Sequence, residues 1–107
     1  MLEVGLYGQN GHQLNHEGHY GGKIRIVAVC GIDVSRIPPK MLAGDAKEYA
    51  TLHDMLHDSR VRMVSLCSPR RHQQAADALC VLRSGKHALC EEPCALTERE
   101  MDILIRE

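Results

Sequence analysis

Tryptophan and phenylalanine are absent from this sequence of 107 residues, and tyrosine occurs three times. Nucleic-acid bases are commonly held by stacking on aromatic side chains, so the chain offers little for such binding. It also lacks a basic excess, because 13 lysines and arginines face 14 aspartates and glutamates for a net charge of -1. A protein without a basic surface does not hold a phosphate backbone. We therefore expect no nucleic-acid partner.

Long apolar runs and a secretory leader are lacking as well. No apolar stretch approaches the ~20 residues that a membrane helix needs. Residues 1–7 have no basic start followed by an apolar core, so they do not form a signal peptide. The five cysteines are odd in number and lack the regular spacing of a secreted disulfide framework. These features predict a cytoplasmic protein with no membrane partner.

What is present is the composition of a globular domain, with 44% hydrophobic and 25% charged residues. A chain of this length builds one domain, which we assign to residues 1–107, and it is too short for a complete two-domain enzyme. Four short apolar runs predict strands. These runs cover residues 2–7, 23–30, 61–67 and 87–90.

Helix signals alternate with these runs. Thr51 begins a helix of two turns, Ser68 with the following proline opens a long helix that Gly85 closes, and Thr97 caps a last helix. Two consecutive prolines shorten or break any helix over residues 32–46. Apolar strands that alternate with amphipathic helices indicate a doubly wound α/β fold, in which both faces of a parallel sheet of about five strands are covered.

The first strand is followed by the loop Gly8-Gln-Asn-Gly11 and a potential helix. In this context glycines let the backbone approach a pyrophosphate, which the amides at a helix start bind. The full dinucleotide pattern needs glycines at positions 8, 10 and 13, where this chain has Gly8, Asn10 and Gln13. Asparagine still tolerates positive φ, whereas glutamine loses the close packing of helix on strand. By itself, the loop sequence fits a plain strand-to-helix turn about as well as it fits a phosphate-binding loop.

The second strand should end near an acid that holds the ribose hydroxyls, and the candidate is Asp33. It lies two residues late if Gly31 stands at the usual position of the acid. Asp33 is then only a turn residue, and Arg36 nearby would equally favour a 2′-phosphate. The residues therefore leave NAD and NADP open.

Two motifs in the second half of the chain are more specific: Ser68-Pro-Arg-Arg-His72, and Gly85-Lys-His-Ala-Leu-Cys-Glu-Glu-Pro93. They resemble motifs of the Gfo/Idh/MocA (glucose-fructose oxidoreductase/inositol dehydrogenase) family. That family has a proline-containing loop with a histidine after the fourth strand, and a Gly-Lys-His-Val stretch that runs into Glu-Lys-Pro. The resemblance covers essentially the whole chain, including His16, which matches a histidine often found after the family's glycine loop.

The resemblance implies a Rossmann-like domain whose partner is a nicotinamide dinucleotide, NAD or NADP. We expect weak binding, because the glycine loop is incomplete. Complete members of the family add a larger α/β domain that holds the substrate, commonly a sugar or polyol, and we expect that domain to be absent here. The residues expected to contact the cofactor are Gly8, Asn10, Gly11, His12, Asp33, Ser68, Pro69, His72 and Glu91.

One family residue is replaced by a residue of opposite charge. The lysine of Glu-Lys-Pro is usually assigned to catalysis, and Glu92 stands at its position. A lysine stabilises a developing alkoxide, whereas an ionised Glu92 opposes one, although a carboxylate can serve as a base. Lys86 is no substitute, because it matches a different family lysine at the other end of the strand. We expect the nucleotide-binding portion of an oxidoreductase that is inactive alone; the alternative is a non-catalytic module for nucleotide binding or association.

Two further features bear on ligands and partners. His12 and His16 have the spacing to share a helix face and bind a metal, but they lie in a glycine-rich loop, and we expect no metal site. The strand over residues 87–91 would lie at an edge of the sheet without a neighbour. An exposed apolar edge pairs readily with another strand, which predicts a homodimer through that edge.

Overall fold

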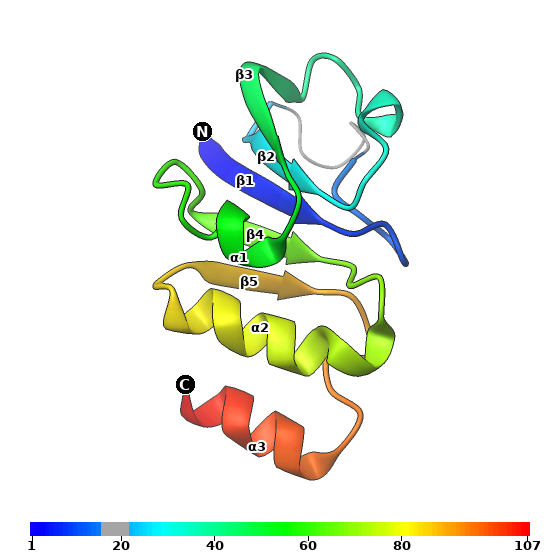
Figure 1. Ribbon diagram of the computed structural model, residues 1–107, viewed down its shortest axis with the longest axis vertical. Helices are drawn as coiled ribbons and strands as arrows, with labels where there is room; N and C mark the ends of the chain where they lie inside the picture. The colour runs from blue at the N-terminus through cyan, green and yellow to red at the C-terminus, as the bar shows by residue number, and fades with distance from the viewer. Residues whose placement is uncertain (16–21) are drawn as a thin grey trace.

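The computed structural model describes residues 1–15 and 22–107. In chain order, the elements are β1 (Leu2–Tyr7), β2 (Ile24–Cys30), η1 (Val34–Arg36), β3 (Leu42–Tyr49), α1 (Leu52–Met55), β4 (Met63–Leu66), η2 (Arg71–Gln73), α2 (Gln74–Arg83), β5 (His87–Cys90) and α3 (Glu98–Arg106). All five strands pair in parallel in one sheet of order β3-β2-β1-β4-β5 (Figure 1). The expected doubly wound α/β fold with a five-stranded parallel sheet is confirmed.

The strand order reverses direction at the central strand β1. The chain moves outward from β1 to β3, returns to the other side of β1, and continues through β4 to β5. The carboxyl ends of β1 and β4 are neighbours, because Tyr7 pairs with Leu66. In open parallel sheets, ligands bind at such a reversal, outside the carboxyl ends of the strands. The fold therefore places the loops after β1, β2, β4 and β5 around one candidate site.

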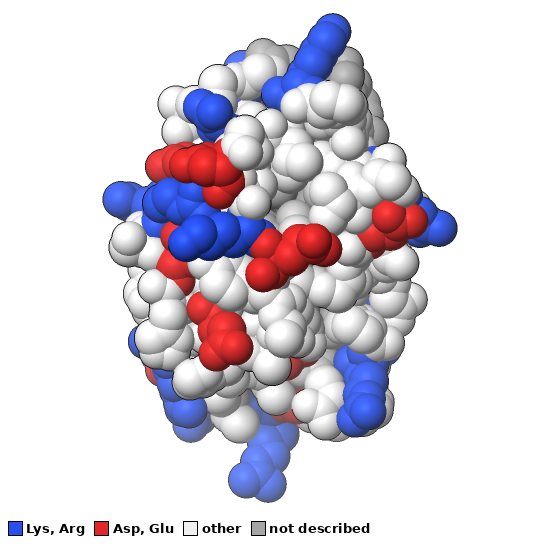
Figure 2. Space-filling view, turned by 45° about the horizontal axis from the view of Figure 1, so that its top comes forward, with Lys and Arg blue, Asp and Glu red and all other residues white. Residues whose placement is uncertain are grey.

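The surface carries both signs of charge. In Figure 2, acidic and basic side chains lie next to one another, and neither sign forms a continuous field over the visible face. Asp45, for example, pairs with Arg60 at 3.3 Å. None of the described helices is long and apolar enough to cross a membrane.

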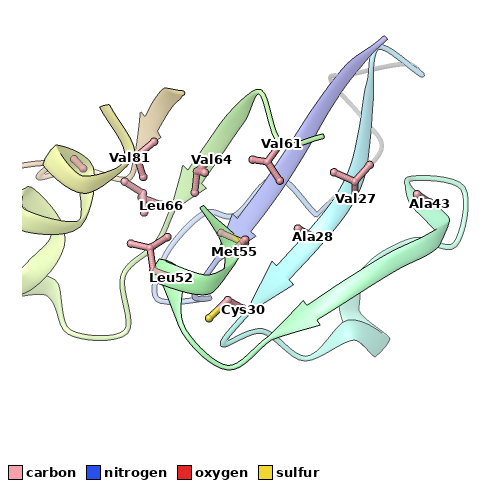
Figure 3. Close-up of a cluster of buried hydrophobic side chains, with 11 residues drawn as sticks. Val27, Ala28, Cys30, Ala43, Leu52, Met55, Val61, Val64, Leu66 and Val81 are labelled. Atoms are coloured by element: carbon pink, nitrogen blue, oxygen red, sulfur yellow. The ribbon is translucent and has the colours of Figure 1, made fainter. Parts of the chain in front are cut away.

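One face of the sheet is covered by α1 and α2. Figure 3 shows side chains of α1 pointing at the strands, where Met55 meets Val61 and Val64. Met55, Val64 and Leu66 are fully buried, and each contributes on the order of 1.5–3 kcal/mol through removal of apolar surface from water. In Figure 1, α3 lies beside α2 at the far side from β1.

The opposite face is covered differently. Val4, Leu6 and Ile26 of the sheet pack against Leu14 and Ile37, which come from connecting segments. The helix expected after the glycine loop does not begin within residues 8–15, because that stretch is held by side-chain and main-chain bonds without a helical turn. His16 lies outside the described residues, so the interpretations that include it have no structural counterpart.

Three elements, namely one strand and two helices, differ from the sequence predictions. β3 was not predicted, because an edge strand with one partner carries polar residues that hide the apolar pattern. The helix after Thr51 has one turn instead of two and ends at Met55. The helix expected to open at Ser68 begins at Gln74 after the 3-10 turn η2, because Arg70 remains extended.

Candidate functional site

The glycine loop after β1 is held between two neighbouring strands. Gly8 has φ +75°, and its amide donates to the carbonyl of Cys30 at 2.8 Å. A Cβ atom on Gly8 would lie 2.1 Å from the carbonyl oxygen of Cys67. The next contact is the Asn10 amide, which donates to the same Cys67 oxygen at 3.2 Å. Only glycine permits the chain to pass between the ends of β2 and β4 in this way.

The same loop already binds an anionic group of the protein. The backbone amide of His12 donates to a carboxylate oxygen of Glu91, and the imidazole Nδ1 lies 3.1 Å from that oxygen. A Cβ atom on Gly11 would overlap this carboxylate. The His12 amide, followed by the Glu92 amide at 3.0 Å, lowers the pKa of Glu91, because both stabilise its ionised form. The loop is thus a site for negative charge.

Two side chains fasten the loops after β1, β4 and β5 to one another. Arg71 donates to the carbonyl of Asn10 and, at 2.9 Å, to that of Glu92. Gln74 is fully buried; it accepts from the Ser68 amide at 3.0 Å and donates to the carbonyl of Glu91. Neither residue was predicted to belong to the site. The signal for Gln74 was its place on the buried face of α2, where a glutamine needs partners.

Gln13 fills the place where the dinucleotide pattern has its third glycine. Its side chain is buried, and its nitrogen approaches three main-chain carbonyls at the ends of β1 and β4: Gly8 at 2.9 Å, Ser65 at 3.2 Å and Tyr7 at 3.3 Å. Its oxygen accepts from the amide of the next residue at 2.9 Å. The Gln13 side chain therefore connects the carboxyl ends of the neighbouring strands β1 and β4.

The motif after β4 contributes through packing. The ring of Pro69 lies against Gly8, close enough that a Cβ there would be 2.9 Å from it. Ser68 is fully buried, and its hydroxyl donates to Asp77 at 2.7 Å. Burial raises the pKa of Asp77, and the Ser68 hydroxyl offsets part of that rise. His72 is exposed on η2.

A hollow of about 200 Å³ adjoins this motif. Its walls are Tyr7, Pro69, Arg70, Gln73 and Asp77. Burial, and then the charge of Asp77, raise the pKa of Tyr7. The hollow lies beside the end of β1 and is lined by both polar and apolar side chains.

Asp33 lies in the turn after β2 and caps η1. Its carboxylate accepts from the Ser35 amide at 3.0 Å and from the Ser35 hydroxyl at 2.7 Å, and these two bonds lower its pKa. The Asp33 amide donates to the side chain of Gln9 at 3.0 Å. The carboxylate is therefore directed into its own turn, while the backbone is tied to the glycine loop.

Glu92 is exposed and is followed by a cis bond to Pro93. Its backbone is fully used, since the amide donates to Glu91 and the carbonyl accepts from Arg71. Lys86 lies just before β5, at the amino end of that strand, where its ammonium donates to the carbonyls of Asp58 and Val61 at 3.1 and 2.8 Å. Its distant place agrees with the prediction that it is no substitute for the family lysine.

No metal centre is found among residues 1–15 and 22–107, because their histidine, cysteine, aspartate and glutamate side chains do not gather in groups of three or more. All five cysteines are free thiols. Backbone amides, carboxylates, the His12 imidazole and the Arg71 guanidinium meet at the site.

Comparison with known proteins gives one family. The model of the Gfo/Idh/MocA family, described as an oxidoreductase family with an NAD-binding Rossmann fold, matches residues 4–107. The inositol 2-dehydrogenases of Salmonella typhimurium and Salmonella agona are each 30% identical over 98% of this chain. The chain spans 31% of the length of these relatives.

Solved structures share the fold. An NAD-binding oxidoreductase from Klebsiella pneumoniae superposes with a TM-score of 0.74 at 23% identity, over 98% of this chain and 30% of its own. A myo-inositol dehydrogenase from Lactobacillus casei, in complex with NAD(H) and myo-inositol, gives 0.66 at 22% identity, over 99% and 34%. The WlbA dehydrogenase from Bordetella pertussis, in complex with NADH and UDP-GlcNAcA, gives 0.69 at 19% identity, over 98% and 31%.

Proposed function

Because the chain belongs to the Gfo/Idh/MocA family of oxidoreductases, we propose that it binds a nicotinamide dinucleotide as part of an enzyme that oxidises or reduces a sugar or polyol at a CH–OH group. The cofactor is proposed from the family, which is described by its NAD-binding Rossmann fold. The substrate class is proposed from the inositol 2-dehydrogenases that the chain matches.

The observation that carries the proposal is the bond from the His12 amide to the carboxylate of Glu91. A pyrophosphate, like a carboxylate, is an anion that accepts backbone N–H groups. Gly11 provides the second requirement, since a Cβ there would overlap the carboxylate that the loop binds, and Gly8 lets the loop pass between the strand ends. The loop therefore fits the diphosphate of a dinucleotide.

We assign roles to the predicted residues on this basis. Gly11 and His12 bind the diphosphate through their amides, whereas Gly8 and Asn10, whose amides donate to Cys30 and Cys67, hold the loop against the strand ends. Pro69 supplies an apolar wall, and the buried Ser68 supports the loop through Asp77. Asp33 and His72 flank the site from the loops after β2 and β4.

Glu92 is assigned as the base. In the oxidation direction a bound nicotinamide would accept the hydride, and the exposed carboxylate of Glu92 would accept the proton that leaves the substrate hydroxyl; in the reverse direction the protonated Glu92 would return that proton. Glu91 lies next to it and is ionised in its contact with the glycine loop. A second candidate function follows from this pair of acids: their charge opposes an alkoxide, which favours a non-catalytic module that binds the nucleotide without turnover.

We also propose a cytoplasmic location and a homodimer. Five free thiols suit a reducing compartment. The outer edge of β5 has no partner strand within the described chain, and Leu89 on that strand is 44% exposed. An unpaired edge of this kind invites a second strand.

Titration calorimetry with NADH and NADPH tests the proposal, with Glu91→Gln as the informative variant. Glutamine still accepts from the His12 amide but removes a negative charge beside the diphosphate. We expect the dinucleotide to bind about 3- to 10-fold more tightly, in line with the repulsion between charges a few ångströms apart.

Glu92→Gln is the matched control. It removes the neighbouring carboxylate, which has no bond to the glycine loop, and we expect a smaller gain in affinity. Absence of heat with both dinucleotides would overturn the proposed function. Weaker binding by Glu91→Gln would show that the diphosphate does not meet this carboxylate.

A further inference from the structure

Position 31 faces the glycine loop and carries no side chain. Gly31 follows β2 directly, with φ +66°. A Cβ atom there would lie 3.8 Å from the backbone of Gly8 and from the ring of Pro69, and nothing lies closer. A side chain at this position would therefore lie beside the glycine loop. This is where an acid would hold the two ribose hydroxyls of NAD.

The nearest acid does not take over that task. Asp33 uses one carboxylate oxygen to accept both the amide and the hydroxyl of Ser35. These bonds direct the carboxylate into the η1 turn and keep it ionised there. A ribose hydroxyl that approaches this oxygen competes with the cap, and the second carboxylate oxygen is held in the same turn.

Arg36 is the last residue of the η1 turn, and hydrogen bonds of the turn hold its backbone in place. Its backbone amide donates to the Asp33 carbonyl at 3.0 Å, and the next residue, Ile37, donates to Val34 at 3.0 Å. Ile32 and Ile37 are buried at the two ends of the turn and anchor it to the sheet. Arg36 itself is exposed, and within the described ranges no carboxylate lies within ion-pair distance of its guanidinium.

We propose that this chain selects the 2′-phosphorylated dinucleotide NADP(H) over NAD(H), with Arg36 binding the 2′-phosphate and Gly31 leaving room for it. An acid at position 31 would repel that phosphate, and a guanidinium pairs with it through charge-assisted hydrogen bonds. The inference rests on the proposed dinucleotide site and specifies which dinucleotide fills it.

Separate titrations of the whole chain with NADPH and NADH test the inference. We expect NADPH to bind about 10-fold more tightly, which is the effect of one hydrogen-bonded charge pair. Arg36→Ala should remove this difference by weakening NADPH about 10-fold and leaving NADH within about 2-fold. Arg25→Ala, at the other end of β2, is the control and should leave both affinities unchanged.

Gly31→Asp tests the second half of the inference. Aspartate tolerates positive φ better than most residues, and the space above Gly31 is open. The variant should favour NADH over NADPH. Binding of NADH as tight as NADPH by the unaltered chain would overturn the inference and leave the proposed function intact. Binding of neither dinucleotide would overturn both.

Discussion

Gln13 shows how a single side chain gives the glycine loop a different support from the one its pattern suggests. Its buried amide group bridges main-chain carbonyls at the ends of β1 and β4. Gln13→Gly restores the third glycine of the dinucleotide pattern, yet we expect it to lower the free energy of unfolding by about 2–4 kcal/mol, because buried carbonyls lose their donor. Chemical denaturation followed by circular dichroism measures the change.

Gln9→Gly is the control for this substitution. Gln9 is exposed and makes one bond, from the Asp33 amide at 3.0 Å. We expect its replacement to cost less than about 1 kcal/mol. If the two glycine variants were equally stable, the Gln13 contacts would not support the loop.

At the same scale, the predictable part of the site was its backbone chemistry. The glycines and the Glu91 motif were found from the sequence, because close approach and fixed order leave a pattern. Arg71 and Gln74 were not, since a donor to a main-chain carbonyl far along the chain has no sequence period. Their partners are set by the fold alone.

Among the elements, β3 depends on a polar network for its attachment. The Tyr49 hydroxyl at its end donates to Asp58 at 2.8 Å, and Arg60 pairs with the same carboxylate at 2.9 Å. Arg60 also donates to the carbonyl of Val27 in β2 at 3.1 Å. The network therefore joins the edge strand, its neighbour and the turn before β4.

Asp58→Asn should lower the free energy of unfolding by about 1–3 kcal/mol at pH 7, because two donors to a buried carboxylate weaken together. The Arg60 guanidinium holds the pKa of Asp58 well below its usual range. A lowered native pKa contributes stability above the unfolded value of about 4, and the contribution is lost as the pH falls further. The difference between the two proteins should shrink from pH 5 downward. Urea titrations at several pH values measure it.

The control is Asp45→Asn. Asp45 also pairs with Arg60, at 3.3 Å, but its side chain is 79% exposed. Exposed pairs contribute little, and we expect a change within about 0.5 kcal/mol. A pH-independent loss in Asp58→Asn would contradict the role given to its charge.

Elements with a clear local sequence signal were predicted best. β1 and β5 match their apolar runs, and the capping box of α3 forms between Thr97 and Glu100. β3 was not predicted, because many of its residues are polar and exposed, and the sequence therefore shows no alternation of apolar and polar positions. The 3-10 turn before α2 was not predicted, because it depends on hydrogen bonds from Ser68 to the side chains of Gln74 and Asp77.

For the whole molecule, the two edges of the sheet differ in how they meet solvent. β3 carries Asp45, Lys47 and Glu48 along one edge, a composition that discourages pairing. β5 at the other edge has the exposed Leu89 and no acidic or basic residue after His87. We expect the chain to self-associate through β5 and not through β3.

Leu89→Lys should shift the protein toward the monomer, because a lysine at a strand edge must lose water to pair. Sedimentation velocity over a range of protein concentrations measures the shift. Glu48→Gln on β3 adds the same unit of positive charge at the other edge and should leave the sedimentation coefficient unchanged. A monomer at all concentrations in the unaltered protein would contradict the homodimer.

The guanidinium of Arg71 gives the molecule a property that belongs to no single loop. It donates to the carbonyl of Asn10 in the loop after β1 and to that of Glu92 in the loop after β5. A ligand that moves either carbonyl changes the bond made to the other. If a ligand at the loop after β1 strengthens binding at the loop after β5 through this group, the reverse holds by the same factor. One side chain thus couples two loops that lie far apart in the sequence.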